Sequence, residues 1–215
     1  MPLKVNEIFY SIQGESSYAG RPCVFVRLTG CNLRCSYCDT QYAYEEGKWF
    51  EIPEIVQQIA SFDCRLVEIT GGEPLLQQQT PALIRTLLDR SFTVLLETNG
   101  SRDIGVVDER CIRIVDVKGP SSGESVKNRL DNLDLLTPRD ELKFVIGNRQ
   151  DYEYAKNILG IRMPHRDKIG TPLFSMVFGK IEAQTLAGWI LDDRLDVRLQ
   201  LQLHKLIWDP QQRGV

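Results

Sequence analysis

The sequence predicts a single α/β domain over residues 1–215, built as a partial, laterally open (β/α) barrel. Short apolar runs alternate along the chain with amphipathic segments, which is the pattern of repeated βαβ units. Polar motifs follow the apolar runs, at the end where the parallel strands of a barrel converge and active sites are built. Because 215 residues are few for eight such units, and no linker or internal repeat divides the chain, we expect one incomplete barrel.

The apolar runs are predicted to be strands, and unbroken runs such as Phe144-Val145-Ile146 are typical of strands buried in a parallel sheet. In chain order the predicted strands are 24–28, 66–70, 93–97, 112–117, 142–146, 173–177 and 197–203. Polar or glycine residues stand at or just beyond the C-terminal ends of these strands, namely Cys31, Gly71, Asn99, Lys118 and Ser175. We therefore expect these residues to belong to one site.

The segments between the strands carry apolar residues at the spacing of one helix face. These faces are formed by Ile55, Val56, Ile59 and Ala60, by Leu83, Ile84, Leu87 and Leu88, and by Leu186, Trp189 and Ile190. Residues 119–128, which read Gly-Pro-Ser-Ser-Gly-Glu-Ser-Val-Lys-Asn, are predicted to form a flexible loop without core residues.

Composition and charge narrow the class of protein. With 42% hydrophobic and 26% charged residues, the chain is typical of soluble globular proteins, and its net charge of -3 gives no electrostatic basis for binding nucleic acid directly. No apolar stretch has the length of a signal peptide or a membrane span, so we expect a cytoplasmic protein whose thiols stay reduced. Cys23, Cys64 and Cys111 have apolar neighbours and are predicted to be buried in the core.

The most informative motif is a group of three cysteines, Cys31, Cys35 and Cys38, in C-x3-C-x2-C spacing. Each iron of a four-iron cluster takes one ligand from outside the cluster, so three thiolates would leave one iron open for a reacting molecule. The alternatives are a zinc knuckle, or a disulfide with one spare thiol. A tetrahedral zinc site would need a fourth Cys or His nearby, and both histidines lie more than a hundred residues away. The spacing therefore favours an iron–sulfur cluster.

This loop resembles the cluster-binding loop of radical S-adenosylmethionine (SAM) enzymes, and Thr70-Gly71-Gly72-Glu73-Pro74 resembles their second hallmark. Further stretches resemble one family among them, the 7-carboxy-7-deazaguanine synthases. These stretches are residues 9–15 (Phe-Tyr-Ser-Ile-Gln-Gly-Glu), Arg27, Cys38-Asp39-Thr40, Glu97-Thr98-Asn99-Gly100, Asp116-Val117-Lys118 and Leu203-His204-Lys205. The resemblance spans nearly the whole chain and implies a radical SAM domain over residues 1–215, with a cluster loop at 31–38 and a substrate-site segment at 197–215.

The resemblance implies that Cys31, Cys35 and Cys38 bind a 4Fe-4S cluster and that SAM binds the open iron. The residues that would contact SAM are Tyr37, Cys38, Asp39, Gly72, Glu73, Asp116, Val117, Lys118, Phe174, Ser175, Met176 and Val177. The Gly71-Gly72 pair has no Cβ and would let the backbone approach the amino group of SAM. Two segments depart from the family, which usually has Ser-Pro-Lys where this chain has Asp116-Val117-Lys118, and Gln-Pro-Met near residues 174–177. At residues 174–177 we therefore expect only backbone contacts to SAM.

The same resemblance implies that the substrate is 6-carboxy-5,6,7,8-tetrahydropterin, converted to 7-carboxy-7-deazaguanine with loss of ammonia in queuosine and deazapurine biosynthesis. Its binding residues would be Ile12, Gln13, Gly14, Glu15, Arg27, Thr70 and His204, and Thr40 would hold Mg2+. The residues themselves leave alternatives open. Arg27 could instead form a structural salt bridge, since a charge in an apolar run needs some partner. Thr40 could be a helix N-cap, Glu15 a solvated charge and His204 a packing residue.

The resemblance also implies a flavodoxin-like or ferredoxin-like electron donor and a homodimer. Two other functions are considered. A glycyl-radical-activating protein shares the cysteine loop and a similar size, but would lack the Gln-Gly-Glu, Cys-Asp-Thr and His-Lys features. A ferredoxin-like electron carrier has no reason to leave an iron open or to carry Gly-Gly-Glu-Pro.

Overall fold

The computed structural model describes residues 1–162 and 169–215, which form one nine-stranded sheet with helices packed on it. The strands are β1 (Leu3–Ile12), β2 (Pro22–Leu28), β3 (Lys48–Phe50), β4 (Leu66–Gly71), β5 (Thr93–Thr98), β6 (Ile112–Val117), β7 (Glu141–Ile146), β8 (Leu173–Met176) and β9 (Arg198–Gln200). The α-helices are α1 (Ile52–Ala60), α2 (Thr80–Asp89), α3 (Arg149–Arg162), α4 (Ala183–Asp192) and α5 (His204–Ile207).

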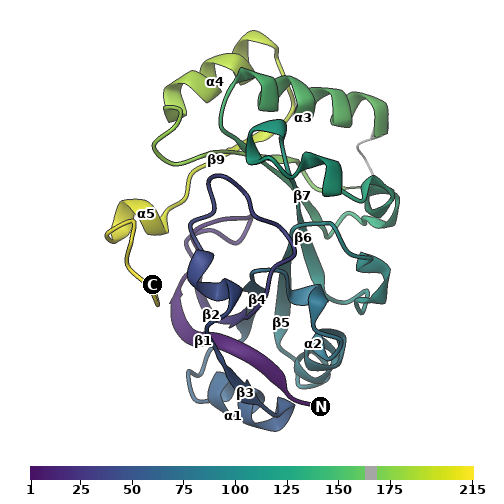
Figure 1. Ribbon diagram of the computed structural model, residues 1–215, viewed down its shortest axis with the longest axis vertical. Helices are drawn as coiled ribbons and strands as arrows, with labels where there is room; N and C mark the ends of the chain where they lie inside the picture. The colour runs from purple at the N-terminus through teal and green to yellow at the C-terminus, as the bar shows by residue number, and fades with distance from the viewer. Residues whose placement is uncertain (163–168) are drawn as a thin grey trace.

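The sheet is open and largely parallel. The spatial order of its strands is β3-β1-β2-β4-β5-β6-β7-β8-β9. β1 pairs antiparallel with β2 and β3, and every neighbouring pair from β2 to β9 is parallel. In Figure 1, α1 lies near one end of the sheet, α3 and α4 lie near the other, and α5 leads to the C-terminus beside the strands. Because β3 and β9 are separate edges of this order, the prediction of a partial, laterally open (β/α) barrel is confirmed.

Each predicted strand and helix face has a counterpart, although the strand predicted at 197–203 covers only Arg198–Gln200, and β1, β3, α3 and α5 were not predicted. In β1 only Leu3 and Val5 are buried and the other residues are partly or fully exposed, so it has no continuous apolar run to identify it. α3 is polar overall, and its buried face depends on a few residues such as Tyr152, Ala155 and Leu159. Tertiary packing, rather than local pattern strength, selects these elements.

Two other predictions need correction. Residues 119–128 are not a loop without core residues, because they form two 3-10 turns and the Ser122 side chain is fully buried. Cys23 and Cys111 are buried as predicted, whereas Cys64 is only half-buried. Its thiol lies 3.5 Å from the carbonyl oxygen of Pro22, at the N-terminal end of the sheet.

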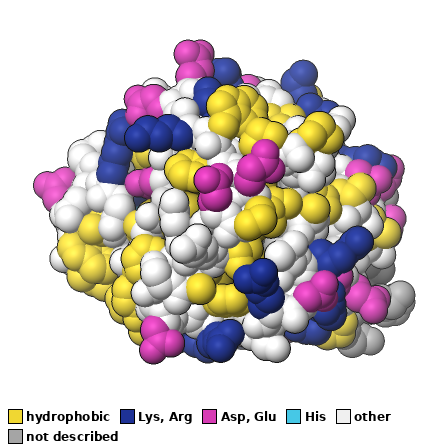
Figure 2. Space-filling view, turned by 90° about the horizontal axis from the view of Figure 1, so that it is seen from below, with side chains coloured by type: hydrophobic (Ala, Val, Ile, Leu, Met, Phe, Trp, Pro, Cys, Tyr) yellow, Lys and Arg dark blue, Asp and Glu magenta, His cyan; other side chains and the backbone are white. Residues whose placement is uncertain are grey.

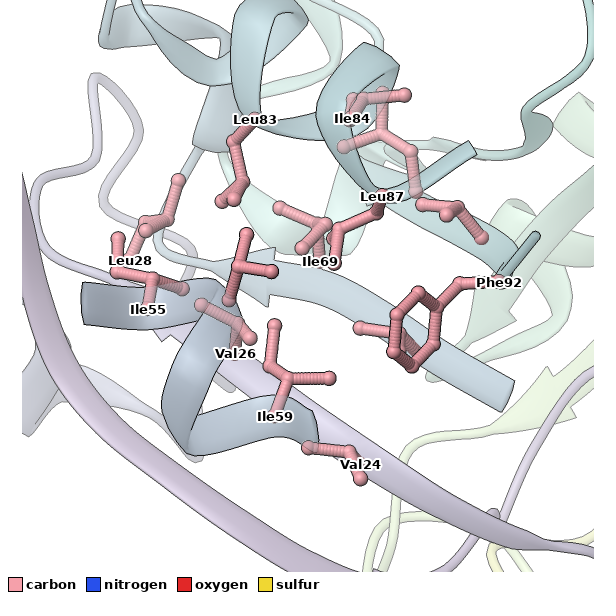
Figure 3. Packing of buried hydrophobic residues seen from close by; sticks show 14 of the residues in the cluster. Val24, Val26, Leu28, Ile55, Ile59, Ile69, Leu83, Ile84, Leu87 and Phe92 are labelled. Atoms are coloured by element: carbon pink, nitrogen blue, oxygen red, sulfur yellow. The ribbon is translucent and has the colours of Figure 1, made fainter. Parts of the chain in front are cut away.

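One face of the strands packs against α1 and α2 to make the main core. Its best-buried members are Val24, Val26, Leu28, Ile55, Ile59, Ile69, Leu83, Ile84 and Leu87, which point toward one another in Figure 3. Each fully buried aliphatic side chain of this size stabilises the fold by about 1.5–3 kcal/mol. This packing fixes the strand ends that carry the polar motifs.

The opposite face of the same strands changes from apolar to polar toward the C-terminal ends. On β2, Cys23 and Phe25 belong to a small apolar cluster, and Arg27 is the next residue on that face. Side chains alternate between the two faces of a strand. The neighbouring strands therefore add Glu68, Thr70, Glu97, Asp116 and Lys143 to the same side, and all of them line one cavity.

The charges on the outer surface are mixed. On the face seen from below, acidic and basic side chains are interspersed (Figure 2), in keeping with the net charge of -3. Among the described residues, no helix has the length and apolar character needed to cross a membrane.

Candidate active site

A cavity of about 440 Å³ lies at the C-terminal ends of the parallel strands. Of the strand-end residues that the sequence predicted to meet, Cys31, Gly71, Asn99 and Lys118 line this cavity. Ser175 is buried behind it, and the neighbouring Met176 and Val177 reach the cavity instead. The motifs that are far apart in the sequence therefore surround a single space.

The cysteine loop follows β2 and its three thiols are free and half-buried at the cavity. The loop is tied to the segment after β6, since Ser36 donates its backbone N–H to the carbonyl of Ser122 at 3.0 Å and its hydroxyl to that of Ser121 at 2.7 Å. Burial raises the pKa of the Cys35 thiol to about 11, although Lys118 nearby favours the thiolate. Binding a metal centre here would therefore release protons.

Neither Gly71 nor Gly72 has room for a side chain in the folded protein. A Cβ on Gly71, whose φ is +147°, would lie 2.1 Å from the carbonyl oxygen of Leu28. A Cβ on Gly72 would lie 2.3 Å from the carbonyl oxygen of Gly30 and 2.7 Å from the Cβ of Cys31. The glycines therefore let the end of β4 pass directly against the beginning of the cysteine loop.

The carboxylate of Glu73 points into the protein, away from the cavity. It accepts hydrogen bonds from the Thr98 hydroxyl at 2.8 Å, the Asn99 backbone N–H at 2.7 Å and the Leu75 backbone N–H at 2.9 Å. Glu73 therefore joins the Gly-Gly turn to the end of β5, and only its backbone remains for the expected contact with SAM.

We predict that Gly72→Ala already disturbs the cysteine loop, since the added methyl group overlaps the backbone of Gly30. Iron bound after anaerobic reconstitution should fall well below the wild-type value. Gly188→Ala in α4 is the matched control, because a Cβ there meets nothing within 4 Å and Ala favours helix. Equal iron content in both variants would mean that the loop can move aside without cost.

The residues expected to contact SAM divide into two groups. Tyr37, Asp116 and Lys118 line the cavity, whereas Val117 and Phe174 are buried in the core between the sheet and α3. Val117 and Phe174 could therefore contact SAM only through their backbone atoms. Three buried oxygens in this region, Tyr37 Oη, Asp116 Oδ1 and Ser175 Oγ, have no hydrogen-bond partner in the described chain.

Asp116 and Lys118 form an ion pair at 2.7 Å between Oδ2 and Nζ. Burial alone would lower the pKa of the Lys118 ammonium, but the Asp116 carboxylate outweighs burial and raises it. Lys118 is thus a cation beside Cys35 and Tyr37. A buried polar atom without a partner is costly unless a ligand satisfies it, so Asp116 Oδ1 and Tyr37 Oη mark a place for a polar ligand.

The other side of the cavity holds a buried group of charges around Lys143. Its ammonium donates to Glu97 Oε1 at 2.6 Å and forms an ion pair with Glu15. Gln200 and Gln202 donate to the Glu15 carboxylate at 3.1 Å and 2.9 Å. Burial would lower the pKa of Lys143, yet the two carboxylates raise it well above its ordinary value. Burial and the Glu97 carboxylate raise the pKa of Glu68, which favours its protonated form.

Gln13 lines the cavity as expected, and its amide is also bonded within the chain. Its Nε2 donates to Glu68 and its Oε1 accepts the backbone N–H of Glu15 at 3.0 Å. The amide therefore fixes the Glu68 carboxyl group and the backbone at Glu15. Gly14 is required by His204, since a Cβ on Gly14 would lie 2.2 Å from the His204 Nδ1. Ile12, Gly14, Glu15 and His204 all line the cavity.

Arg27 forms the structural salt bridge that the sequence left open, and it also lines the cavity. Its Nε donates to Glu7 Oε1 at 2.7 Å, which is the structural salt bridge, and Tyr42 donates to the same oxygen at 3.0 Å. The guanidinium lies between the rings of Phe9 and Tyr42, with 5.8 Å to each ring centroid. No other hydrogen bond of Arg27 is present within residues 1–162 and 169–215, so its Nη edge can face a ligand in the cavity.

Thr40 and the C-terminal segment lie together at the cavity mouth. The Thr40 hydroxyl donates to Asp39 Oδ1 at 2.9 Å and makes no N-cap bond to the following 3-10 turn. Lys205 forms an ion pair with Asp39 at 2.5 Å. Burial opposes ionisation of Asp39, but Lys205 prevails and lowers its pKa to about 2. Residues 210–215 also line the cavity, and Arg213 reaches Glu46 at 3.2 Å.

Sequence reasoning missed Lys143, Glu68 and Glu97 as side chains of the site. Two of them could have been found in the sequence as charged residues within apolar runs, because Lys143 lies in Leu142-Lys143-Phe144 and Glu68 lies in Val67-Glu68-Ile69. Like Arg27, each of these is a charge within a buried strand and needs a partner.

The chain was compared with known proteins. Residues 25–161, more than half of the chain, match the family model described as the radical SAM superfamily. A 7-carboxy-7-deazaguanine synthase of Chlorobaculum tepidum is 50% identical over 218 residues, covering 100% of this chain and 98% of the relative. A 7-carboxy-7-deazaguanine synthase of Koribacter versatilis (strain Ellin345) is 45% identical over 227 residues, covering 99% and 100%. The crystal structure of QueE from Escherichia coli has a TM-score of 0.76 at 22% identity and covers 93% of this chain and 94% of that chain, which shows a likeness of fold.

Proposed function

Because the chain belongs to the radical SAM superfamily and, within it, to the 7-carboxy-7-deazaguanine synthases, we propose that it converts 6-carboxy-5,6,7,8-tetrahydropterin to 7-carboxy-7-deazaguanine with loss of ammonia. One observation carries the proposal. The three free cysteines share a cavity with Arg27, which can bind a carboxylate, and with the carboxylates of Glu15 and Glu97. Such a cavity can hold a reactive cofactor on one side and an anionic, donor-rich heterocycle on the other.

The donor set fits a 4Fe-4S cluster better than the alternatives from the sequence. Among the described residues, no three His, Cys, Asp or Glu side chains converge on a point where one metal ion could be held. A zinc knuckle requires such convergence, whereas a cubane cluster takes each thiolate on a different iron. None of the described cysteines forms a disulfide. Cys31, Cys35 and Cys38 would therefore hold the cluster and leave one iron open.

When bound, the cluster and SAM would supply the radical chemistry that the reaction needs. The residues of the chain would bind and orient SAM and the substrate and shield them from water. Lys118, Asp116 and Tyr37 offer charge and unsatisfied oxygens on the SAM side. The Arg27 Nη edge would bind the substrate carboxylate, and the Glu15 and Glu97 carboxylates would accept from the amino and N–H groups of the pterin. Residues 210–215 would cover the mouth and exclude water.

We propose that Mg2+ binds at Thr40, as the family resemblance implies. The Thr40 hydroxyl supports this, since it donates to Asp39 and forms no N-cap bond, so that its oxygen can still accept a cation. Magnesium prefers hard oxygen ligands and retains waters, so the substrate carboxylate and water would complete the site. The same resemblance supports a flavodoxin-like or ferredoxin-like electron donor, a homodimer and a cytosolic location.

The glycyl-radical-activating alternative is not favoured. The relatives named above share 45–50% identity over 99–100% of the chain and are named 7-carboxy-7-deazaguanine synthases. An electron carrier would not need a cavity of about 440 Å³ beside its cysteines.

The proposal is tested by turnover. The anaerobically reconstituted chain is given SAM, a reductant and 6-carboxy-5,6,7,8-tetrahydropterin, and 7-carboxy-7-deazaguanine and ammonia are measured by mass spectrometry and a coupled assay. We expect both products in equal amounts, with SAM not consumed in proportion. Reductive cleavage of SAM without either product would assign the chain to another radical SAM reaction.

Arg27→Ala should weaken binding of the pterin more than a hundredfold, because it leaves the substrate carboxylate without a partner at a cost of about 3–5 kcal/mol. Arg27→Lys should recover little, since an ammonium cannot form the two-pronged contact. Iron content and SAM affinity should stay at wild-type values in both variants. Substrate affinity is measured by isothermal titration with SAM present.

Glu7→Gln is the matched control for Arg27. It weakens the structural ion pair at Nε but keeps the guanidinium in the cavity. If Arg27 acts only through its salt bridge, Glu7→Gln and Arg27→Ala should have the same effect on the pterin. We expect Glu7→Gln to lose far less affinity.

A further inference from the structure

Asn99 is held in one orientation directly after β5. Its backbone N–H donates to the buried Glu73 carboxylate at 2.7 Å, and its side-chain Oδ1 accepts the backbone N–H of Ser101 at 3.0 Å. Only 7% of the residue is exposed. Because an N–H donor occupies Oδ1, the amide cannot be reversed, and its Nδ2 must face the other way.

The Nδ2 group of Asn99 faces the cysteine loop. It lies 3.3 Å from Asn32 Oδ1 and 3.9 Å from Cys31 Sγ. The same sulfur accepts the backbone N–H of Leu33 at 3.4 Å. Cys31 is thus a thiol toward which two N–H groups are directed, one from its own loop and one from a neighbouring strand end.

Hydrogen bonds to the sulfurs of an iron–sulfur cluster favour its reduced form, because the reduced form carries more negative charge. We infer that Asn99 is a positioning residue that raises the reduction potential of the cluster through its N–H bond to Cys31 Sγ. The inference rests on the proposed function, since it requires the cluster. The Glu73 carboxylate supports this role of Asn99, because it fixes the backbone position from which the Asn99 side chain reaches Cys31 Sγ.

The test is the midpoint potential of the reconstituted cluster, measured by a redox titration followed by electron paramagnetic resonance. Asn99→Ala removes the donor and should move the midpoint to a more negative potential at unchanged iron content. Asn99→Asp keeps the shape and the acceptor for Ser101 but puts a carboxylate against the sulfur. It should move the midpoint further in the same direction.

Asn32→Ala is the contrasting variant, because it removes the competing acceptor of Asn99 Nδ2 and leaves the donor free for Cys31 Sγ. Its midpoint should stay at the wild-type value or move to a more positive potential, opposite to the Asn99 variants, and a negative shift equal to that of Asn99→Ala would overturn the inference. Equal midpoints in wild type and both Asn99 variants, at equal iron content, would overturn the inference and leave the proposed function untouched. Loss of iron from both Asn99 variants would also overturn it, because Asn99 would then hold the loop rather than tune the cluster. A wild-type chain that assembles no cluster would instead contradict the proposed function.

Discussion

Cys35→Ala should reduce the 4Fe-4S content of the reconstituted protein from one cluster per chain to none. Each of Cys31, Cys35 and Cys38 would supply the only protein ligand of one iron, and a chain with two thiolates cannot hold the cubane in place. The expected result is the loss of both the iron and the visible absorption. Iron and sulfide are measured after anaerobic reconstitution, and the same outcome is expected for Cys31→Ala and Cys38→Ala.

The other cysteines provide the control. Cys64→Ala should keep full iron content, because Cys64 lies by Pro22 at the N-terminal end of the sheet, opposite the strand ends that form the site. Cys23→Ala and Cys111→Ala should also keep the cluster, with some loss of stability from the buried space they leave. A normal cluster in Cys35→Ala, or its loss in Cys64→Ala, would refute the assignment of ligands.

Lys143→Met should lower the free energy of unfolding by about 3–5 kcal/mol, the cost of breaking a buried ion pair by removing one partner. Lys143 is 5% exposed, and it is the cation that neutralises Glu15 and Glu97. Without it, both carboxylates must stay charged without compensation or take up protons. Urea unfolding of the apo protein, followed by circular dichroism, measures the change.

Two further variants separate charge from packing at Lys143. Adding Glu97→Gln to Lys143→Met should restore part of the stability, because one unpaired charge is then removed as well. Lys156→Met removes a more exposed lysine that pairs with Asp193 at 2.6 Å, and should cost much less. If Lys143→Met lowered the free energy of unfolding no more than Lys156→Met does, Lys143 would not be needed to stabilise the buried Glu15 and Glu97 carboxylates.

The sequence by itself determined the cysteine spacing, the Gly-Gly-Glu-Pro turn and the alternation of apolar runs with helical segments. The cysteine spacing favours an iron–sulfur cluster, and the alternation of apolar runs with helical segments favours parallel strands joined by helices. From these it follows that residues such as Cys31, Gly71, Asn99 and Lys118 meet at one end of the sheet. The structure agrees, and places all four on one cavity.

Tertiary structure alone decided which way each side chain points. Glu73 was expected to contact SAM, yet its carboxylate is bonded to Thr98 and Asn99. Gln13 lines the cavity, and only the structure shows that its amide is bonded to Glu68. Lys143 gained its place in the site only when β7 brought it beside Glu97 and the loop after β1 added Glu15. The physical reason is that a hydrogen bond or ion pair depends on a few tenths of an ångström between residues distant in sequence, and local patterns carry no information at that scale.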